Sequence, residues 1–179
     1  MFNFFGIKGV RFKRRLEKGG LILQLCRLQD LPALHSLITP EVFRETASAE
    51  FQAFRSLFFF LKWVMTTFQV IYLIEIDESG THRIVGLAGL YDIELSRSLR
   101  LSLTVFNPED RRRGYGEKAL KLLLGLLQEN GAAEVVYAEV LKNNVPSLRL
   151  CIKLGFKVKR LYQDRVLLEK DQKRKSEEG

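Results

Sequence analysis

The chain has 179 residues, of which 46% are hydrophobic, and its formal net charge is +8. This length provides one domain with a sizeable core and excludes two ordinary domains. Residues 1–18 hold six basic residues and one acidic residue, a net charge of +5, so the excess lies at the N-terminus and excludes a nucleic-acid footprint spread over the fold. We expect no specific nucleic-acid partner.

The cysteines and histidines argue against disulfides and metal sites. Cys26 and Cys151 are too few and too isolated for a disulfide framework, and the two histidines lie too far apart for zinc-ligand spacing. Charges interrupt the N-terminus from Lys8 onward, so the apolar segment of a secretory signal is not indicated. We therefore expect a metal-free protein of the reducing cytoplasm.

Residues 1–20 combine several aromatic side chains with the basic cluster. Such a segment can lie on an anionic membrane surface or on a partner. The alternative, which we favour, is an extension that packs on its own domain or is partly disordered. Because Gly19-Gly20 is typical of a boundary, we expect a basic extension at 1–20, one domain at 21–170 and a charged tail at 171–179.

Two helices are expected early in the domain. A strand over Leu21–Leu28 leads to Asp30, a suitable N-cap for a helix that ends at about Leu37. A second helix is expected over Ala49–Thr66, with a stripe at helical spacing formed by Phe51, Phe54, Phe58, Leu61 and Met65. Charged residues interrupt it before the about 18–20 apolar residues that a membrane span needs. We expect a buried helix; an acceptor-site wall or a dimer surface is the functional alternative.

The rest of the domain alternates between strands and helices. Val70–Asp77 and Arg83–Glu94 are expected to form an antiparallel hairpin, which the strand 101–106 extends to a meander. Further along the chain we expect a helix from about Gly116 to Asn130, a strand at Glu134–Val140, a helix at Val145–Leu154, and strands at Phe156–Tyr162 and Arg165–Lys170.

The most informative stretch is Arg111-Arg112-Arg113-Gly114-Tyr115-Gly116, between a strand and an amphipathic helix. A helix N-terminus presents unpaired N–H groups and a partial positive charge, which together bind phosphate. Glycines let the backbone turn tightly and approach an anion, and arginines add positive charge. The pattern favours a pyrophosphate cradle; the alternative is a turn in a solvated basic loop. The P-loop and GxGxxG patterns are not present.

Two motifs in this order resemble those of the GNAT acyltransferase family. Arg111-x-x-Gly114-x-Gly116 resembles its acetyl-CoA signature, R/Q-x-x-G-x-G/A. The stretch NVPSLRLCIKLGF at 144–156 resembles its closing helix, N-x-x-(A/S)-x-x-L-Y-x-x-x-G-F. The resemblance covers roughly residues 21–169 and is nearest to the branch that acetylates ribosomal-protein termini, polyamines and amino sugars. It implies an α/β fold with a mixed, mostly antiparallel twisted sheet flanked by helices.

The resemblance also implies how acetyl-CoA binds. The cofactor strand and the next strand splay apart, and the pantetheine arm lies between them against the backbone of Thr104, Val105 and Phe106. The pyrophosphate would be held by the backbone amides of Arg112, Arg113, Gly114, Tyr115, Gly116 and Glu117, with Arg111 bracing the loop. Asn144 would contact the cofactor, unless a one-residue slip gives that role to Asn143.

The catalytic residues are less well marked. At the position of Cys151 the family often has a tyrosine that acts as the general acid. Cys151 is either a weak substitute for that tyrosine or a buried apolar residue. Tyr91 and Glu94, with Asp92 between them, end a strand next to the cofactor strand, and Tyr162 sits at a strand end. These are candidate proton carriers; the alternative for the acids is a solvated strand edge.

Taken together, the resemblance implies an N-acetyltransferase that transfers acetyl from acetyl-CoA to a primary amine, on a small molecule or a protein N-terminus, by direct attack. One alternative is a catalytically idle acyl-CoA-binding domain, favoured by Cys151. Another is a membrane- or nucleic-acid-associated binding module that acts through the basic extension. His35, on an apolar helix, is expected to be structural, and a homodimer stays open.

Overall fold

The computed structural model describes residues 12–39, 42, 56–78, 80–94 and 97–172. Along the chain its elements are β1 (Arg15–Lys18), β2 (Leu21–Leu25), η1 (Leu28–Asp30), α1 (Leu31–Leu37), α3 (Leu57–Thr67), β3 (Val70–Glu78), β4 (Thr81–Glu94), β5 (Ser98–Val105), η3 (Pro108–Asp110), α4 (Tyr115–Glu129), β6 (Val135–Leu141), α5 (Val145–Lys153), β7 (Lys157–Leu161) and β8 (Arg165–Asp171).

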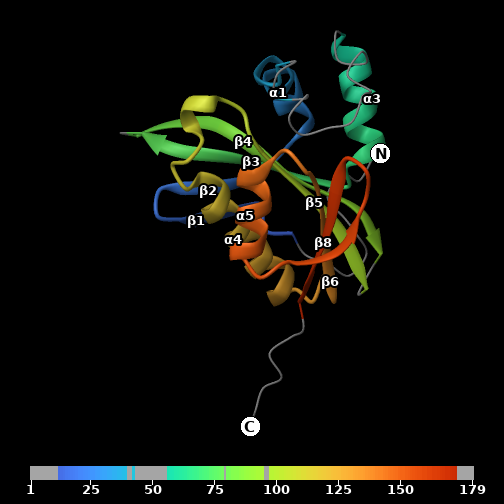
Figure 1. The fold of residues 1–179 in the computed structure, drawn as a ribbon. Coiled ribbons are helices and arrows are strands. Elements are labelled where there is room, and N and C mark those ends of the chain that lie inside the picture. Colours follow the sequence, from blue (N-terminus) through green and yellow to red (C-terminus); the bar gives the residue numbers. More distant parts are fainter. Residues whose placement is uncertain (1–11, 40–41, 43–55, 79, 95–96, 173–179) are drawn as a thin grey trace.

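These elements build one twisted sheet in the strand order β1-β2-β3-β4-β5-β6-β8-β7 (Figure 1). Neighbouring strands pair antiparallel, except that β5 and β6 are parallel. The meander β3-β4-β5 and the mixed, mostly antiparallel sheet confirm the expected fold class. The parallel step requires the α4 crossover, because parallel strands need a long connection.

The central strands are buried on both faces. On β3, Tyr72 and Ile74 belong to the apolar layer that contains α4 and α5, whereas Ile71 and Leu73 belong to the layer that contains α1 and α3. This follows from the two-residue period of a strand, which sends successive side chains to opposite faces. The sheet therefore has one face covered by α4 and α5, in front in Figure 1, and one covered by α1 and α3.

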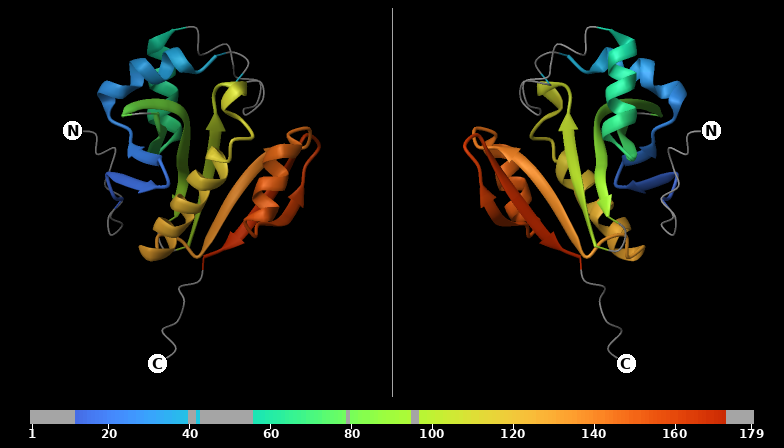
Figure 2. Two further views of the ribbon diagram at one scale, coloured as in Figure 1. Left: turned by 90° about the vertical axis from the view of Figure 1, so that its left-hand side faces the viewer. Right: turned by 90° about the vertical axis from the view of Figure 1, so that its right-hand side faces the viewer.

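The parallel strands are paired at one end only. Their register runs from Ser98 opposite Val135 to Leu101 opposite Ala138. Beyond these residues β5 continues its pairing with β4, and β6 continues its pairing with β8, so the two strands diverge. Figure 2 shows the resulting V between β5 and β6. We call this opening the fork.

The N-terminal boundary differs from the prediction. β1 pairs with β2, and Gly19 and Gly20, with φ of 58° and 74°, form the turn between them. Residues 15–18 are therefore an edge strand of the sheet, and the glycine pair is a hairpin turn, which only a backbone tolerant of positive φ makes easily. The membrane or partner hypothesis concerns residues 1–20, of which residues 1–11 lie outside the described part of the chain.

The C-terminal end of the sheet extends slightly beyond the predicted domain. Gln172 is buried, and its N–H donates to the carbonyl of Glu134 at 2.7 Å. Asp171, assigned to the tail by sequence, is thus the last residue of β8, and the buried Gln172 packs directly after it. Residues 173–179 lie outside the described part.

The prediction of a buried second helix is wrong. In α3 the buried side chains are Phe60 and Val64, while Phe58 and Phe59 are 69% and 52% exposed. Of the expected stripe, Phe58 and Met65 therefore face outward, whereas Leu61 packs against the buried cluster of Phe60 and Val64. Because the first five residues of α3, Leu57–Leu61, are all apolar, their periodicity could not indicate which face of the helix packs. Residues 43–55, which include the predicted start of the helix, lie outside the description.

No helix in the described part of the chain is long and apolar enough to cross a membrane.

Candidate active site

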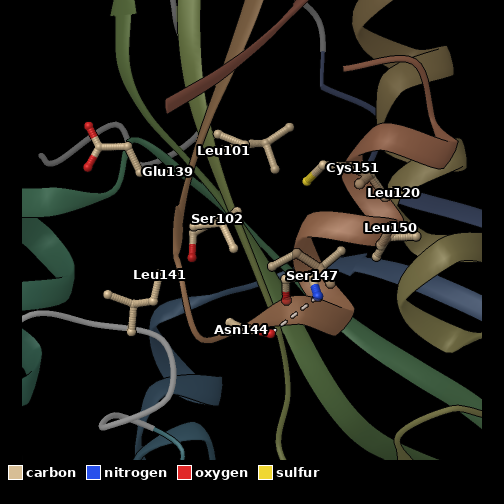
Figure 3. Close-up of a pocket in the computed structure, with 12 residues that line it drawn as sticks. Leu101, Ser102, Leu120, Glu139, Leu141, Asn144, Ser147, Leu150 and Cys151 are labelled. Atoms are coloured by element: carbon tan, nitrogen blue, oxygen red, sulfur yellow. Dashed lines mark hydrogen bonds between the residues drawn. The ribbon is translucent and has the colours of Figure 1, made fainter. Parts of the chain in front are cut away.

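The fork holds a cleft of about 60 Å³ between β5, β6, α4 and α5. Its wall on the helix side is largely apolar and includes Leu101, Leu120 and Leu150. In Figure 3 the sulfur of Cys151 points from α5 toward the cleft, whereas the carboxylate of Glu139 is turned away from α5. The cleft thus has an apolar side under α4 and α5 and a polar side on the opposite face of the sheet.

The glycine loop enters α4 through left-handed backbone conformations. Arg112 has φ of 63° and Gly114, the N-cap residue, has φ of 81°. Gly114 provides no side-chain cap, and the first helical hydrogen bond runs from the N–H of Lys118 to the carbonyl of Gly114 at 3.0 Å. The amides of Tyr115, Gly116 and Glu117 precede that bond, so they have no partner within the helix. An anion can accept hydrogen bonds from these amides.

Gly116 has a different task from Gly114. A Cβ on Gly116 would lie 3.3 Å from Cδ2 of Leu103 and 3.6 Å from Cδ2 of Leu150, two residues that line the cleft. A Cβ on Gly114 would meet nothing within 4 Å. Gly116 therefore lets α4 approach β5 closely beside the cleft, while Gly114 supplies the turn.

Arg111 braces the loop, as predicted. Its Nε donates to the carbonyl of Val105 at 3.3 Å and its Nη2 to the carbonyl of Phe106 at 3.4 Å. Arg112 and Arg113 are exposed. The guanidinium of Arg111 is thus directed to the end of β5, and Arg112 and Arg113 supply accessible positive charge beside the α4 N-terminus.

The backbone of β5 corrects part of the cofactor prediction. The carbonyl of Thr104 faces β4, where it would collide with a Cβ on Gly86, and the N–H of Phe106 donates to the carbonyl of Val85 at 2.9 Å. Since successive backbone groups alternate sides along a strand, Val105 and its second neighbour Leu103 face the fork instead. A contact with pantetheine fits Val105 but not the strand-like hydrogen bonds expected from Thr104 and Phe106.

The start of α5 lines the cleft. Asn144 is the N-cap residue, and its Oδ1 accepts a hydrogen bond from the N–H of Ser147 at 3.2 Å. Asn144 and Ser147 line the cleft, whereas Asn143 is exposed. The residue that the one-residue slip would have favoured is thus outside the cleft, and the capping bond explains why this helix starts with asparagine.

Cys151 is a buried thiol in the cleft wall. Burial raises its pKa to about 11, because a thiolate would be poorly solvated there. The thiol is therefore protonated at neutral pH. Two titratable side chains contribute to the cleft lining, Cys151 and Glu139.

Sequence reasoning missed Glu139. Arg100 Nη1 donates to its Oε1, and Arg165 Nη1 donates to its Oε2 at 3.4 Å. Arg100 also pairs with Asp92, Nε to Oδ2 at 3.3 Å. The available signal was its position: Glu139 is the one charged residue in the strand Val135–Leu141, which is otherwise apolar apart from a tyrosine.

Tyr91 lies on the same face, near this cluster. Burial and then the negative charge of Glu139 raise its pKa. Next to it, Asp92 has φ of 47° at an irregularity in the pairing of β4 with β5. Such a left-handed conformation is costly for aspartate and persists where surrounding contacts hold it. Asp92 thus lies beside Tyr91, on strand β4 next to the cluster around Glu139.

The other predicted catalytic residues lie apart from the cleft lining. Glu94 is exposed and pairs with Arg97 at 3.5 Å. Tyr162 is exposed in the connection between β7 and β8. His35 packs its ring 5.0 Å from that of Phe60, a placement that suits the structural role expected for it. Among the described residues, no group of three His, Cys, Asp or Glu side chains is placed to hold a metal ion.

Glu117 connects the two helices beside the cleft. Its carboxylate pairs with Lys121 and with Lys153, each at 2.7 Å. These hydrogen bonds hold the pKa of Glu117 down at about 2. The side chain therefore joins α4 to α5, while its amide remains part of the helix N-terminus.

Comparison with known proteins agrees with this geometry. The family model of the acetyltransferase (GNAT) domain matches residues 20–157. A GNAT-family acetyltransferase from Bacillus anthracis is 16% identical with a TM-score of 0.69, over 88% of this chain and 98% of that chain. No curated protein sequence matches the chain.

Two further solved structures contain a ligand. The yncA protein of Salmonella typhimurium, with its cofactor acetyl-CoA, is 18% identical with a TM-score of 0.65, over 88% of this chain and 97% of that chain. RimL, a ribosomal L7/L12 alpha-N-protein acetyltransferase in complex with coenzyme A, is 14% identical with a TM-score of 0.70, over 86% of this chain and 95% of that chain. At such identities the likeness shows the fold.

Proposed function

Because this chain belongs to the GNAT acetyltransferase family, we propose that it transfers the acetyl group of acetyl-CoA to a primary amine on a small molecule or a protein N-terminus. The observation that carries the proposal is the fork. It joins the N-terminus of α4, which has no side-chain cap, to a cleft between two strands, and it has a carboxylate on the opposite face.

The donor side fits the chemistry of acetyl-CoA. The amides at the start of α4 and the exposed Arg112 and Arg113 suit a pyrophosphate. The apolar cleft and the edge of β5 that faces the fork at Val105 and Leu103 suit a pantetheine arm that hydrogen-bonds like a strand, although Arg111 already donates to the carbonyl of Val105. When bound, acetyl-CoA supplies an activated thioester. The solved acetyl-CoA and coenzyme A complexes of the same fold support this assignment.

The acceptor amine would approach from the face that carries Glu139. Both carboxylate oxygens of Glu139 are held by Arg100 and Arg165, so its position is defined before a substrate arrives. We assign to Glu139 the removal of the ammonium proton, directly or through a water molecule. A carboxylate at a fixed place on the acceptor side is what that step needs.

Proton delivery to the departing thiolate falls to Cys151, with Tyr91 as the alternative. Cys151 lines the cleft and is protonated at neutral pH, although its raised pKa also makes it a weak acid; after the transfer its thiolate would regain a proton from water. Tyr91 also keeps its proton, because burial and Glu139 raise its pKa. A thiol is a weak hydrogen-bond donor, so we expect this step to contribute less than the step at Glu139.

The test is a calorimetric titration with acetyl-CoA, followed by a screen of amines with thiol release as the readout. Saturable binding that is lost in Gly116→Trp, together with turnover on at least one amine class, would support the proposal. The panel includes polyamines, amino sugars and peptides with a free N-terminus. Binding without turnover on any amine would establish instead the idle acyl-CoA-binding domain. No binding would refute both.

A further inference from the structure

Asp110 is a buried carboxylate immediately before the glycine loop. Its side chain is 4% exposed. It lies in η3, a single turn whose start is capped by Asn107, with Oδ1 accepting from the N–H of Glu109 at 3.0 Å. A carboxylate that is removed from water needs a strong partner. The partner, Arg83, comes from strand β4.

Arg83 on β4 binds both oxygens of Asp110. Its Nη1 donates to Oδ2 at 2.7 Å and its Nη2 to Oδ1 at 2.9 Å. This two-point geometry fixes direction as well as distance. The same guanidinium reaches Glu78 Oε1 at 3.2 Å, at the end of β3. Arg83 thereby connects the β3–β4 hairpin to the residue that precedes the loop.

The loop that follows Asp110 has little freedom. Arg111 is tied to the carbonyls at the end of β5, and the chain then passes through left-handed conformations at Arg112 and Gly114. A left-handed arginine is costly and is maintained by contacts around it. The Asp110 anchor and the Arg111 brace are adjacent in sequence and point to two different strands, so together they define where the loop begins.

The pair also keeps the negative charge of Asp110 away from the loop cations. Arg113 lies near enough that its charge contributes to lowering the pKa of Asp110, after the larger effect of Arg83. Since Arg83 takes both oxygens of Asp110, the guanidinium of Arg113 stays exposed. Without Arg83, the carboxylate would compete with a phosphate for Arg113.

We infer that the Arg83–Asp110 ion pair positions the glycine loop for the pyrophosphate of the acyl donor, so that both are positioning residues for donor binding. This inference rests on the proposed function. Neither Arg83 nor Asp110 is among the residues that line the cleft; the pair acts through residues 111–116. Its loss should therefore affect ligands that contain the pyrophosphate and spare those that do not.

The experiment compares coenzyme A with pantetheine, which lacks the pyrophosphate and the nucleotide. Calorimetry and ligand-observed NMR give the two dissociation constants for wild type, Arg83→Met and Arg83→Lys. We expect the Kd for coenzyme A to rise by about ten- to a hundredfold in Arg83→Met, the equivalent of about one hydrogen bond to a charged group. Arg83→Lys, which keeps the charge but loses the two-point geometry, should lie between. The Kd for pantetheine should not change.

Arg15→Met is the matched control. Arg15 is 43% exposed, against 41% for Arg83, and pairs with the exposed Glu17 on β1. Thermal unfolding is measured for each variant, and Arg83→Lys carries the test where Arg83→Met does not fold. An unchanged Kd for coenzyme A, or an equal loss for pantetheine, would overturn the inference alone. A wild-type protein that binds no coenzyme A would refute the proposed function as well.

Discussion

The two sides of the fork differ in how they are assembled. The donor side comes from one continuous stretch, the end of β5, the glycine loop and the start of α4. The acceptor side brings together Tyr91 from β4, Arg100 from β5, Glu139 from β6 and Arg165 from β8. The donor side relies on backbone amides, whereas the acceptor side relies on charged side chains.

This difference indicates which side carries which property. A backbone site tolerates changes of most side chains but not of its glycines, so it suits a cofactor common to a family. A side-chain site changes with each substitution, so it suits a variable acceptor. Variants on the two sides should therefore affect different kinetic constants.

The largest effect is expected from Glu139→Gln. It removes the proton acceptor while keeping the shape of the side chain, so kcat should fall about a hundred- to ten-thousandfold, the usual contribution of acid–base catalysis. Steady-state kinetics and calorimetry should show the Kd for acetyl-CoA unchanged. Glu129→Gln, which removes an exposed pair with Lys13, is the control. An equal loss of cofactor affinity would place Glu139 on the donor side.

The next effect tests the donor backbone with two matched glycines. Gly114 and Gly80 have φ of 81° and 86°, and a Cβ on either would meet nothing within 4 Å. Alanine at either position should cost about 1–2 kcal/mol of stability, measured by urea unfolding, because L-residues resist this conformation. Only Gly114→Ala should also weaken coenzyme A binding, by about tenfold or ~1.4 kcal/mol. If Gly114→Ala bound coenzyme A as tightly as wild type, the glycine loop would be a turn without a role in binding.

Cys151→Ala should have a smaller effect on kcat. We expect a loss of about tenfold, below the usual range for a general acid, because a thiol donates weakly. The KM for acetyl-CoA should stay near the wild-type value. Tyr91→Phe is measured in parallel: if it lowers kcat while Cys151→Ala does not, the proton donor is on the acceptor side.

The smallest effect concerns Glu117 and acid stability. Its pKa falls from the ordinary value of 4.5 to about 2 on folding. Its contribution is therefore present above about pH 4.5 and is lost as the pH falls toward 2. In Tm measurements from pH 7 to pH 2, Glu117→Gln should be less stable than wild type at neutral pH, and the difference should narrow below about pH 4.5 and be smallest at pH 2. Lys153→Met should show part of this difference. If the Tm of Glu117→Gln and the Tm of wild type fell in parallel from pH 7 to pH 2, the role assigned to Glu117 would be contradicted.

The sequence predicted the strand, the loop and the helix that build the donor side, because their signals are local. Strand, loop and helix follow one another within residues 98–129, and the glycines, arginines and apolar spacing report on backbone geometry at short range. The bracing role of Arg111 was predicted for the same reason. What the motif did not indicate was which residues of β5 face the fork, since that depends on the register with β4.

The remaining features depended on tertiary structure. In α3 the exposed Lys62 and Thr66 share their side of the helix with large apolar residues, so contacts with α1 and the sheet decided that Phe60 and Val64 are buried. Glu139 and Arg83 gained their partners only when β4, β5, β6 and β8 became neighbours. Sequence by itself determined the fold class, most of the strands and helices and the conformation of the glycine loop, because these follow from short-range periodicity and backbone preference. Folding decided the acceptor side and the loop anchor, because ion pairs between distant residues leave no mark in sequence spacing.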